Sequence, residues 1–410
     1  MDEVVYSMTI LAYILTVLAG LACLVWFSRH IMISVENRRG FELDGSYAGP
    51  PADAPRLSVI VAAKDEQDNI ETCLRTMLKQ DYGDFEIIVC NDRSTDRTAA
   101  IVEQIAAEDR RVRLINIDKL PDGWFGKNNA MQTGIRSASG QWLCMIDADC
   151  RQTSPRTLSV AMQYAQDTKA DLLSVLPLLE MKSFWECVIQ PVCSGVMMIW
   201  FHPDKVNSPA KPNAYANGAF MLMKRSAYEA VGTHEAVRQC LNEDMHLARL
   251  TKEKGLSLRV VRGGKLYSVR MYTSFKQILR GWSRIFFGTF GTLRRLSISA
   301  AVMLIMGLLP YFTAAAGLAI GASILPSAGA WRVCGIAGLL AAMVQITAIF
   351  RFYSLIGARA HLAWTYPIGA IMALVALGMS LTRLRKGAAV TWRGTAYATA
   401  VQPAASQVRK

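Results

Sequence analysis

Long uncharged stretches are the clearest feature of the hydrophobic pattern. Residues 4–28 contain no charged side chain, and a helix of this length, at ~1.5 Å per residue, exceeds the ~30 Å of bilayer hydrocarbon. A signal peptide is the alternative, but its apolar region is shorter and follows positive charge, whereas Asp2 and Glu3 precede this one. Residues 1–28 are therefore predicted to be a retained transmembrane anchor.

A second apolar block covers residues 297–382, which contain three arginines, one histidine and no acid. Three more spans fit this block, near residues 298–325, 333–350 and 362–382. Pro310 removes a helical hydrogen bond that neighbouring helices have to replace. Four spans from an outside N-terminus would leave the basic tail, residues 383–410, outside as well, against the cytoplasmic preference of positive charge. One of the four segments is therefore open to being re-entrant or interfacial.

The middle of the chain has a different pattern. Four basic side chains follow the anchor and place the next part in the cytoplasm: Arg29, His30, Arg38 and Arg39. After a linker over residues 29–56, residues 57–270 alternate short apolar runs with helical patterns. The runs are Leu57–Ala63, Phe85–Cys90, Val112–Ile117 and Trp142–Ile146. This alternation predicts an α/β domain with a parallel, doubly wound sheet.

Positive charge is concentrated just before the second apolar block. The chain has a net charge of +13, and residues 252–295 hold eleven lysines or arginines against one acid. Several aromatic residues are interleaved with them, and a membrane span follows directly. We therefore predict a basic amphipathic segment over residues 271–296 that docks on an anionic leaflet. No nucleic acid partner is expected, although the charge alone would suit one.

Acidic residues follow three of the apolar runs. Glu66, Asp92 and the pair Asp147 and Asp149 stand near strand ends, where ligands bind in open α/β sheets. Helix capping is the alternative role for each group taken singly. The chain has neither GxGxxG after the first run nor GxxxxGK[ST] anywhere, which argues against dinucleotide oxidoreductases and P-loop NTPases. Asp-x-Asp instead suits a hard divalent cation that bridges a diphosphate.

Taken in order, these segments resemble a family-2 glycosyltransferase of GT-A fold. The resemblance rests on Ser58–Glu66, Ile88–Asp96, Lys127, Asp147–Asp149 and Asn242–Asp244. Leu120–Lys127 is similar to a membrane-anchored subgroup that includes hopanoid-associated, carotenoid-acid and ceramide-type glycosyltransferases. Thr391–Gly394 with Tyr397 resembles the C-terminal signature of that subgroup. The implied fold is a doubly wound nucleotide-sugar-binding domain with one N-terminal and about three C-terminal transmembrane helices.

The resemblance also implies roles for individual residues. Nucleotide-sugar binding falls to Ala62, Glu66, Asp92, Lys127, Asp147 and Arg280, and binding of a divalent metal, Mg or Mn, to Asp149. Asp244, with Glu243 beside it, is implied to be the general base, and Gly218 and Trp282 are implied to contact the acceptor. The alternatives are a solvated surface role for Lys127 and a helix-capping role for Asp244.

The implied reaction is inverting transfer of a single sugar from a nucleotide-sugar donor, expected to be a UDP-sugar, to a membrane lipid acceptor at the cytoplasmic face. Processive polysaccharide synthases carry Gln-x-x-Arg-Trp, whereas Gly281 here separates Arg280 from Trp282, and one helical residue rotates a side chain by ~100°. A processive synthase and a non-catalytic scaffold or sensor remain as alternatives. The apolar stretch Cys187–Pro203 is expected to be either core or an acceptor-lipid groove.

Overall fold

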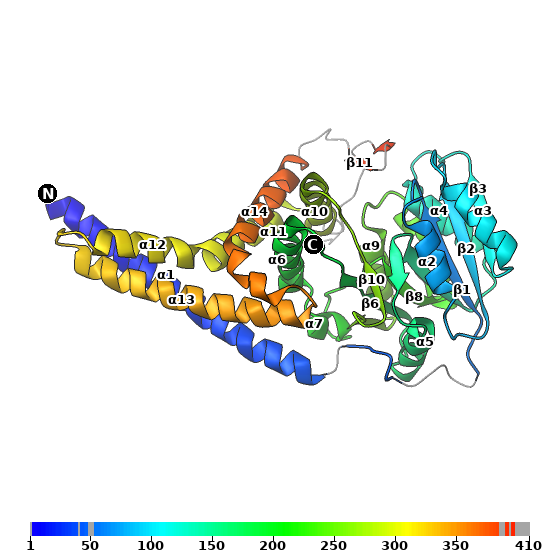
Figure 1. Cartoon of the computed structure of the whole chain (residues 1–410), viewed down its shortest axis with the longest axis horizontal. Coiled ribbons are helices and arrows are strands. Elements are labelled where there is room, and N and C mark those ends of the chain that lie inside the picture. Colours follow the sequence, from blue (N-terminus) through cyan, green and yellow to red (C-terminus); the bar gives the residue numbers. More distant parts are fainter. Residues whose placement is uncertain (1, 40–41, 48–52, 385–389, 393–394, 398–410) are drawn as a thin grey trace.

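The computed structural model describes residues 2–39, 42–47, 53–384, 390–392 and 395–397. Figure 1 shows a sheet domain at one end and a bundle of long helices at the other, with shorter helices between them. The predicted basic tail lies mostly outside the described residues. Two short strands from it, β11 (Val390–Trp392) and β12 (Thr395–Tyr397), pair in antiparallel fashion. Arg393 and Gly394 of the predicted C-terminal signature also lie outside the described residues.

The main sheet has seven strands in the order β3-β2-β1-β4-β8-β6-β9. They are β1 (Leu57–Ala63), β2 (Phe85–Asp92), β3 (Val112–Ile117), β4 (Trp142–Asp147), β6 (Leu172–Leu176), β8 (Phe220–Lys224) and β9 (Leu258–Arg262). The four predicted runs are β1 to β4, and they pair in parallel. The predicted parallel pairing is confirmed for these four strands, whereas β8 runs antiparallel to both of its neighbours. Phe220 pairs with Ile146, so the chain enters β8 at the edge where β4 ends and runs back.

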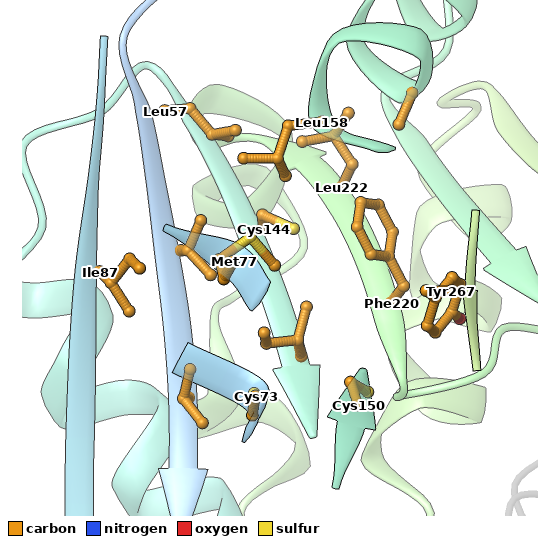
Figure 2. Packing of buried hydrophobic residues seen from close by; sticks show 14 of the residues in the cluster. Leu57, Cys73, Met77, Ile87, Cys144, Cys150, Leu158, Phe220, Leu222 and Tyr267 are labelled. Atoms are coloured by element: carbon orange, nitrogen blue, oxygen red, sulfur yellow. The ribbon is translucent and has the colours of Figure 1, made fainter. Parts of the chain in front are cut away.

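Helices cover both faces of this sheet. One face packs against α2 (Ile70–Met77), α3 (Thr98–Glu108) and α5 (Thr157–Asp167), and the other against α4 (Gly126–Ser137), α8 (Arg225–Ala230) and α9 (Glu243–Glu253). Successive β1 residues alternate between the two cores, with Val59 and Val61 in the first and Ile60 in the second. Figure 2 shows the first core, in which Met77 and Leu158 from helices meet Leu57 and Leu222 from strands.

A smaller sheet lies next to the carboxyl end of β4. Its strands, in the order β5-β10-β7, are β5 (Cys150–Gln152), β10 (Tyr267–Val269) and β7 (Leu178–Leu179). Because β5 begins directly after Asp149 and pairs with β10, the small sheet fixes the turn that carries the Asp-x-Asp pair.

Four helical segments are long and apolar enough to cross a membrane. They are residues 3–35, 293–321, 328–355 and 360–382, close to the four predicted spans. They include α1 (Asp2–Arg39), α11 (Leu293–Val302), α12 (Leu309–Gly321), α13 (Ala328–Leu355) and α14 (Tyr366–Thr382). Large apolar side chains such as Leu24, Phe312 and Phe350 are exposed on them. Such exposed apolar surface fits contact with lipid rather than water.

Pro310 is accommodated by its neighbours, as its position in a span requires. A π-helical turn, Met303–Leu308, precedes it, and the Met306 carbonyl accepts hydrogen bonds from Trp26 Nε1 (2.8 Å) and Gln345 Nε2 (2.6 Å). Side chains of α1 and α13 thus replace part of the interrupted helical ladder.

Between the sheet domain and the long helices lies a layer of shorter helices. It contains α6 (Phe184–Trp200) and α10 (Phe275–Phe290), which pack with α14 around one apolar core. Helix α10 is the predicted basic amphipathic segment, and its Arg280 is exposed while Trp282 is buried against Phe286. Trp282 therefore contributes to this core rather than to an outer surface.

Candidate functional site

The predicted site residues gather around two adjoining cavities at the carboxyl ends of β1, β2 and β4. The smaller cavity, of about 220 Å³, is lined by Ala62, Glu66, Asp92, Lys127, Asp147 and Asp149 among others. The larger, of about 870 Å³, is lined by Lys127, Asp147, Gly218, Trp282, Glu243 and Asp244 among others. Lys127 and Asp147 border both cavities. The structure thus brings together ten of the eleven residues, and Arg280 is outside the lining of both cavities.

Lys127 lies among three acids, Asp147, Glu243 and Asp244, which together are called the acidic cluster. It lies in the first turn of α4, and its ammonium group is 2.6 Å from Asp147 Oδ1 and 2.8 Å from Glu243 Oε1. Burial disfavours its charge, but Asp147, Glu243 and Asp244 outweigh this and raise the pKa of Lys127 well above its usual range. Lys127 is therefore a partly buried, ion-paired cation that joins the end of β4 to the start of α9, not the solvated surface lysine of the alternative.

Asp244 lies in the first turn of α9 and faces the larger cavity. Its two carboxylate oxygens accept hydrogen bonds from the Gly218 N–H (2.8 Å) and the Met245 N–H (2.7 Å). Burial, and then the charge of Glu243, raise the pKa of Asp244. A carboxylate held in this way keeps its orientation and becomes a stronger base.

Gly218 allows the backbone to approach this cluster closely. A Cβ at this position would lie 3.0 Å from Lys127 Nζ and 3.4 Å from Asp244 Oδ2. A larger residue would displace the lysine or weaken the N–H bond that orients Asp244. Gly218 is thus a positioning residue as well as a candidate acceptor contact.

Asp149 differs from the other acids because its Oδ1 atom is buried and has no hydrogen-bond partner. Burial, followed by the charges of Asp147 and Glu66, raises the pKa of Asp149. Among the described residues, no group of three or more His, Cys, Asp or Glu side chains is arranged to hold a metal ion. One or two carboxylates nevertheless suffice when phosphate oxygens and water complete the shell of Mg²⁺. The Asp-x-Asp pair fits such a site.

The opposite end of the smaller cavity is bounded by the turns after β1 and β2. Asp92 is paired with its neighbour Arg93 through two contacts of 2.8 and 2.9 Å. Asn69 donates to Glu66 Oε2 at 2.9 Å. Asp65 and Arg93 both adopt positive φ, 52° and 55°, a conformation that non-glycine residues adopt mainly at functional or tightly constrained positions.

Arg284, and not Arg280, lines the two cavities. One helical turn after Arg280 on α10, it lines both cavities, whereas Arg280 is exposed to solvent. The glycine between Arg280 and Trp282 has a packing reason, since a Cβ at Gly281 would lie 2.2 Å from the Tyr272 hydroxyl oxygen. The signal for Arg284 was present in its spacing of four residues from Arg280, but the facing side of α10 could not be derived from that spacing alone.

The larger cavity continues from the acidic cluster toward the membrane helices. Apolar side chains of α6, of β7 and of the end of α13 line it, including Leu178, Pro191, Met197, Met198 and Phe352. The stretch Cys187–Pro203 is therefore partly core and partly cavity wall, because one side of α6 packs in the layer of shorter helices and the other lines the cavity.

Comparison with known proteins agrees with this arrangement. The family described as Glycosyl transferase family 2 matches residues 58–232. The chain contains a family 2 glycosyltransferase domain. Over 232 residues, 56% of this chain, it is 26% identical to 4,4'-diaponeurosporenoate glycosyltransferase of Staphylococcus aureus strain USA300. The match covers 60% of that relative, so the chain spans less than two thirds of the length of the curated relatives it matches.

The fold of the chain also resembles a solved structure. This is mannosyltransferase PcManGT from Pyrobaculum calidifontis, solved in complex with GDP-Man and Mn²⁺. The TM-score is 0.52 at 19% identity, and the match covers 90% of this chain and 99% of that chain. The predicted GT-A fold is confirmed.

Proposed function

We propose that this chain is an inverting glycosyltransferase that moves one sugar from a nucleoside diphosphate sugar, with UDP as the expected nucleotide, to a membrane lipid at the cytoplasmic face. The observation that carries the proposal is the cavity of about 870 Å³, which joins Asp244 and Lys127 to apolar side chains of α6 and α13. A lipid can place its reactive group at the acids while its apolar part stays out of water.

Asp244 is the proposed base. As the acceptor oxygen attacks the anomeric carbon, Asp244 takes the hydroxyl proton, the new carbon–oxygen bond forms, and the bond from that carbon to the diphosphate oxygen breaks. Attack from the face opposite the leaving group inverts the anomeric centre. A carboxyl acceptor, already ionised at neutral pH, would need no base, so the base role applies to a hydroxyl acceptor.

The departing nucleoside diphosphate gains negative charge, which this chain can meet in two ways. Lys127 and Arg284 border the smaller cavity and supply cations. Asp147 and Asp149 would hold a divalent metal, which when bound supplies Lewis-acid stabilisation to the diphosphate. The PcManGT complex, with Mn²⁺ and GDP-Man, supports the same use of the site here.

A direct assay tests the proposal. Membranes containing the full chain are incubated with radiolabelled nucleotide sugars, and the label that enters the organic phase is measured. We expect one labelled sugar per lipid. A ladder of products would instead support the processive synthase, and no transfer from any nucleotide sugar would support the non-catalytic scaffold.

A further inference from the structure

The larger cavity has a second polar end, remote in sequence from the acidic cluster. Arg262, Lys265 and Arg351 line it there together with Glu42, which contacts Arg262. Leu178 joins these elements, because a Cβ at Gly357, just after α13, would lie 2.5 Å from its Cδ1, and one at Gly264 would lie 3.8 Å from its Cβ. The β9–β10 turn and the end of α13 therefore meet at one place.

Arg351 is held at this end by neutral groups. Its guanidinium donates to His30 Nδ1 (3.1 Å), to the His30 carbonyl (3.1 Å) and to Ser34 Oγ (2.6 Å). An arginine has five N–H donors, so at least two remain for another acceptor. Within the part of the chain that the structure describes, no acidic side chain pairs with Arg351. Its position is fixed by α1 while its charge is left uncompensated.

Arg262 is a second cation at this end with hydrogen-bonding capacity that the protein does not satisfy. Its Nε atom is buried without a hydrogen-bond partner, and its contact with Glu42 is long, at 3.8 Å. Lys265 pairs with Asp44 at 3.2 Å. The cavity end thus has three cations and one acid in its lining, and the buried Nε requires an acceptor.

The position of this end selects the kind of ligand. Arg351 lies in the last turns of α13, next to the water-facing sheet domain, and therefore at the level where lipid headgroups begin. Basic pockets between transmembrane helices at this level suit anionic lipid headgroups. We propose that Arg351 and Arg262 bind the phosphate of an anionic phospholipid at this end of the cavity, away from the acidic cluster. This binding does not depend on the proposed transfer reaction.

Lipid retention by the purified full-length protein tests the site. The protein is equilibrated with vesicles of phosphatidylcholine and phosphatidylglycerol, re-purified in neutral detergent, and its bound lipids are quantified by mass spectrometry. We expect enrichment of phosphatidylglycerol in the wild type and a loss of about fivefold in Arg351→Gln, the effect of removing one interfacial cation. Arg351→Lys should retain part of the lipid, because it keeps the charge.

Two further variants make the test decisive. Arg262→Gln should lower phosphatidylglycerol retention by a similar factor, and it replaces Arg351→Gln if that variant loosens the contact between α1 and α13 and lowers the Tm. Arg359→Gln is the matched control, since Arg359 is an exposed cation just beyond α13 that does not line the cavity. Equal retention of both lipids by the wild type, or an equal loss in Arg359→Gln, would overturn the proposal.

Discussion

Two acid-rich parts of the same sheet edge are built differently. In the turns after β1 and β2, Asp65 accepts hydrogen bonds from Thr95 N–H and Oγ1, and Asp96 accepts from Thr98 N–H and Oγ1. At the end of β4 and the start of α9, Lys127 pairs with Asp147 and Glu243. Its positive charge also acts on Asp149 and Asp244.

This difference in hydrogen bonding distinguishes acids that stabilise a turn from acids that are available for catalysis or metal binding. Carboxylates satisfied by nearby N–H and O–H groups hold a turn in place and have no further need of a ligand. Burial and a neighbouring acid raise the pKa values of Asp149 and Asp244 instead, as expected of carboxylates that act as metal ligands or bases. We therefore expect substitutions at the end of β4 and the start of α9 to lower turnover, and substitutions in the turns after β1 and β2 to lower stability.

The largest expected effect is that of Asp244→Asn. Asparagine keeps the shape of the side chain, and its single amide oxygen can accept from one of the two backbone N–H groups, but it cannot take a proton, so turnover should fall by about 10² to 10⁴. Nucleotide affinity, measured by calorimetry, should stay nearly constant. Asp96→Asn, in the turn after β2, is the control and should retain turnover. A loss of tenfold or less would return Asp244 to a capping role.

Asp149→Asn should remove most activity and yet leave the protein as stable or more stable. The pKa of Asp149 is raised in the folded state by burial, Asp147 and Glu66, so its ionised form opposes folding at neutral pH. Thermal unfolding without added metal tests the stability, and excess chelator on the wild type should reproduce the activity loss. Full activity in chelator would contradict metal assistance.

The pH dependence of turnover sharpens the assignment of the base. A raised pKa means that Asp244 protonates, and loses its function, at a higher pH than an ordinary carboxyl group near 4. With a lipid-alcohol acceptor, kcat should fall on the acid side at a pH well above 4. An acid limb at the ordinary carboxyl pKa would assign the base to a solvated acid elsewhere.

The smallest effect is expected from Asp96→Ala, and it should appear in stability. The Thr98 contacts and the Gln67 N–H outweigh burial and lower the pKa of Asp96, so its stabilisation is present above the unfolded pKa and is lost as pH falls through the folded one. Loss of this turn should cost about 1 kcal/mol at pH 7, measured by denaturant unfolding, with the deficit shrinking in acid. An unchanged free energy of unfolding would contradict it.

Much of this arrangement could be predicted from local pattern. The runs that became β1 to β4 are short and apolar, and the long uncharged segments coincide with α1, α12 and α13. The acids at strand ends were found because parallel strands bring their carboxyl ends to one edge. Hydrophobic periodicity and the position of a residue at a strand end are local properties of the sequence, so predictions based on them agree with the structure.

Features that depend on distant contacts could not be predicted. The direction of β8 follows from its entry at the site edge, and the selection of Arg284 over Arg280 follows from how α10 packs. Gly281 is required by Tyr272, and a Cβ at Gly288 would lie 2.7 Å from Asn242 Cγ. Each of these is a contact between segments whose pairing the hydrophobic pattern does not encode.

The carbonyl of Met306 has a consequence for the order of biosynthesis. It accepts from Trp26, 280 residues earlier in the chain, and from Gln345, 39 residues later. The ribosome makes α1 long before Met306, so the Trp26 indole N–H lacks this acceptor until the π-helical turn has been made. Helix α1 can therefore reach its final packing only after Met306 has been made, and a truncation that ends before Met306 should leave α1 incompletely packed.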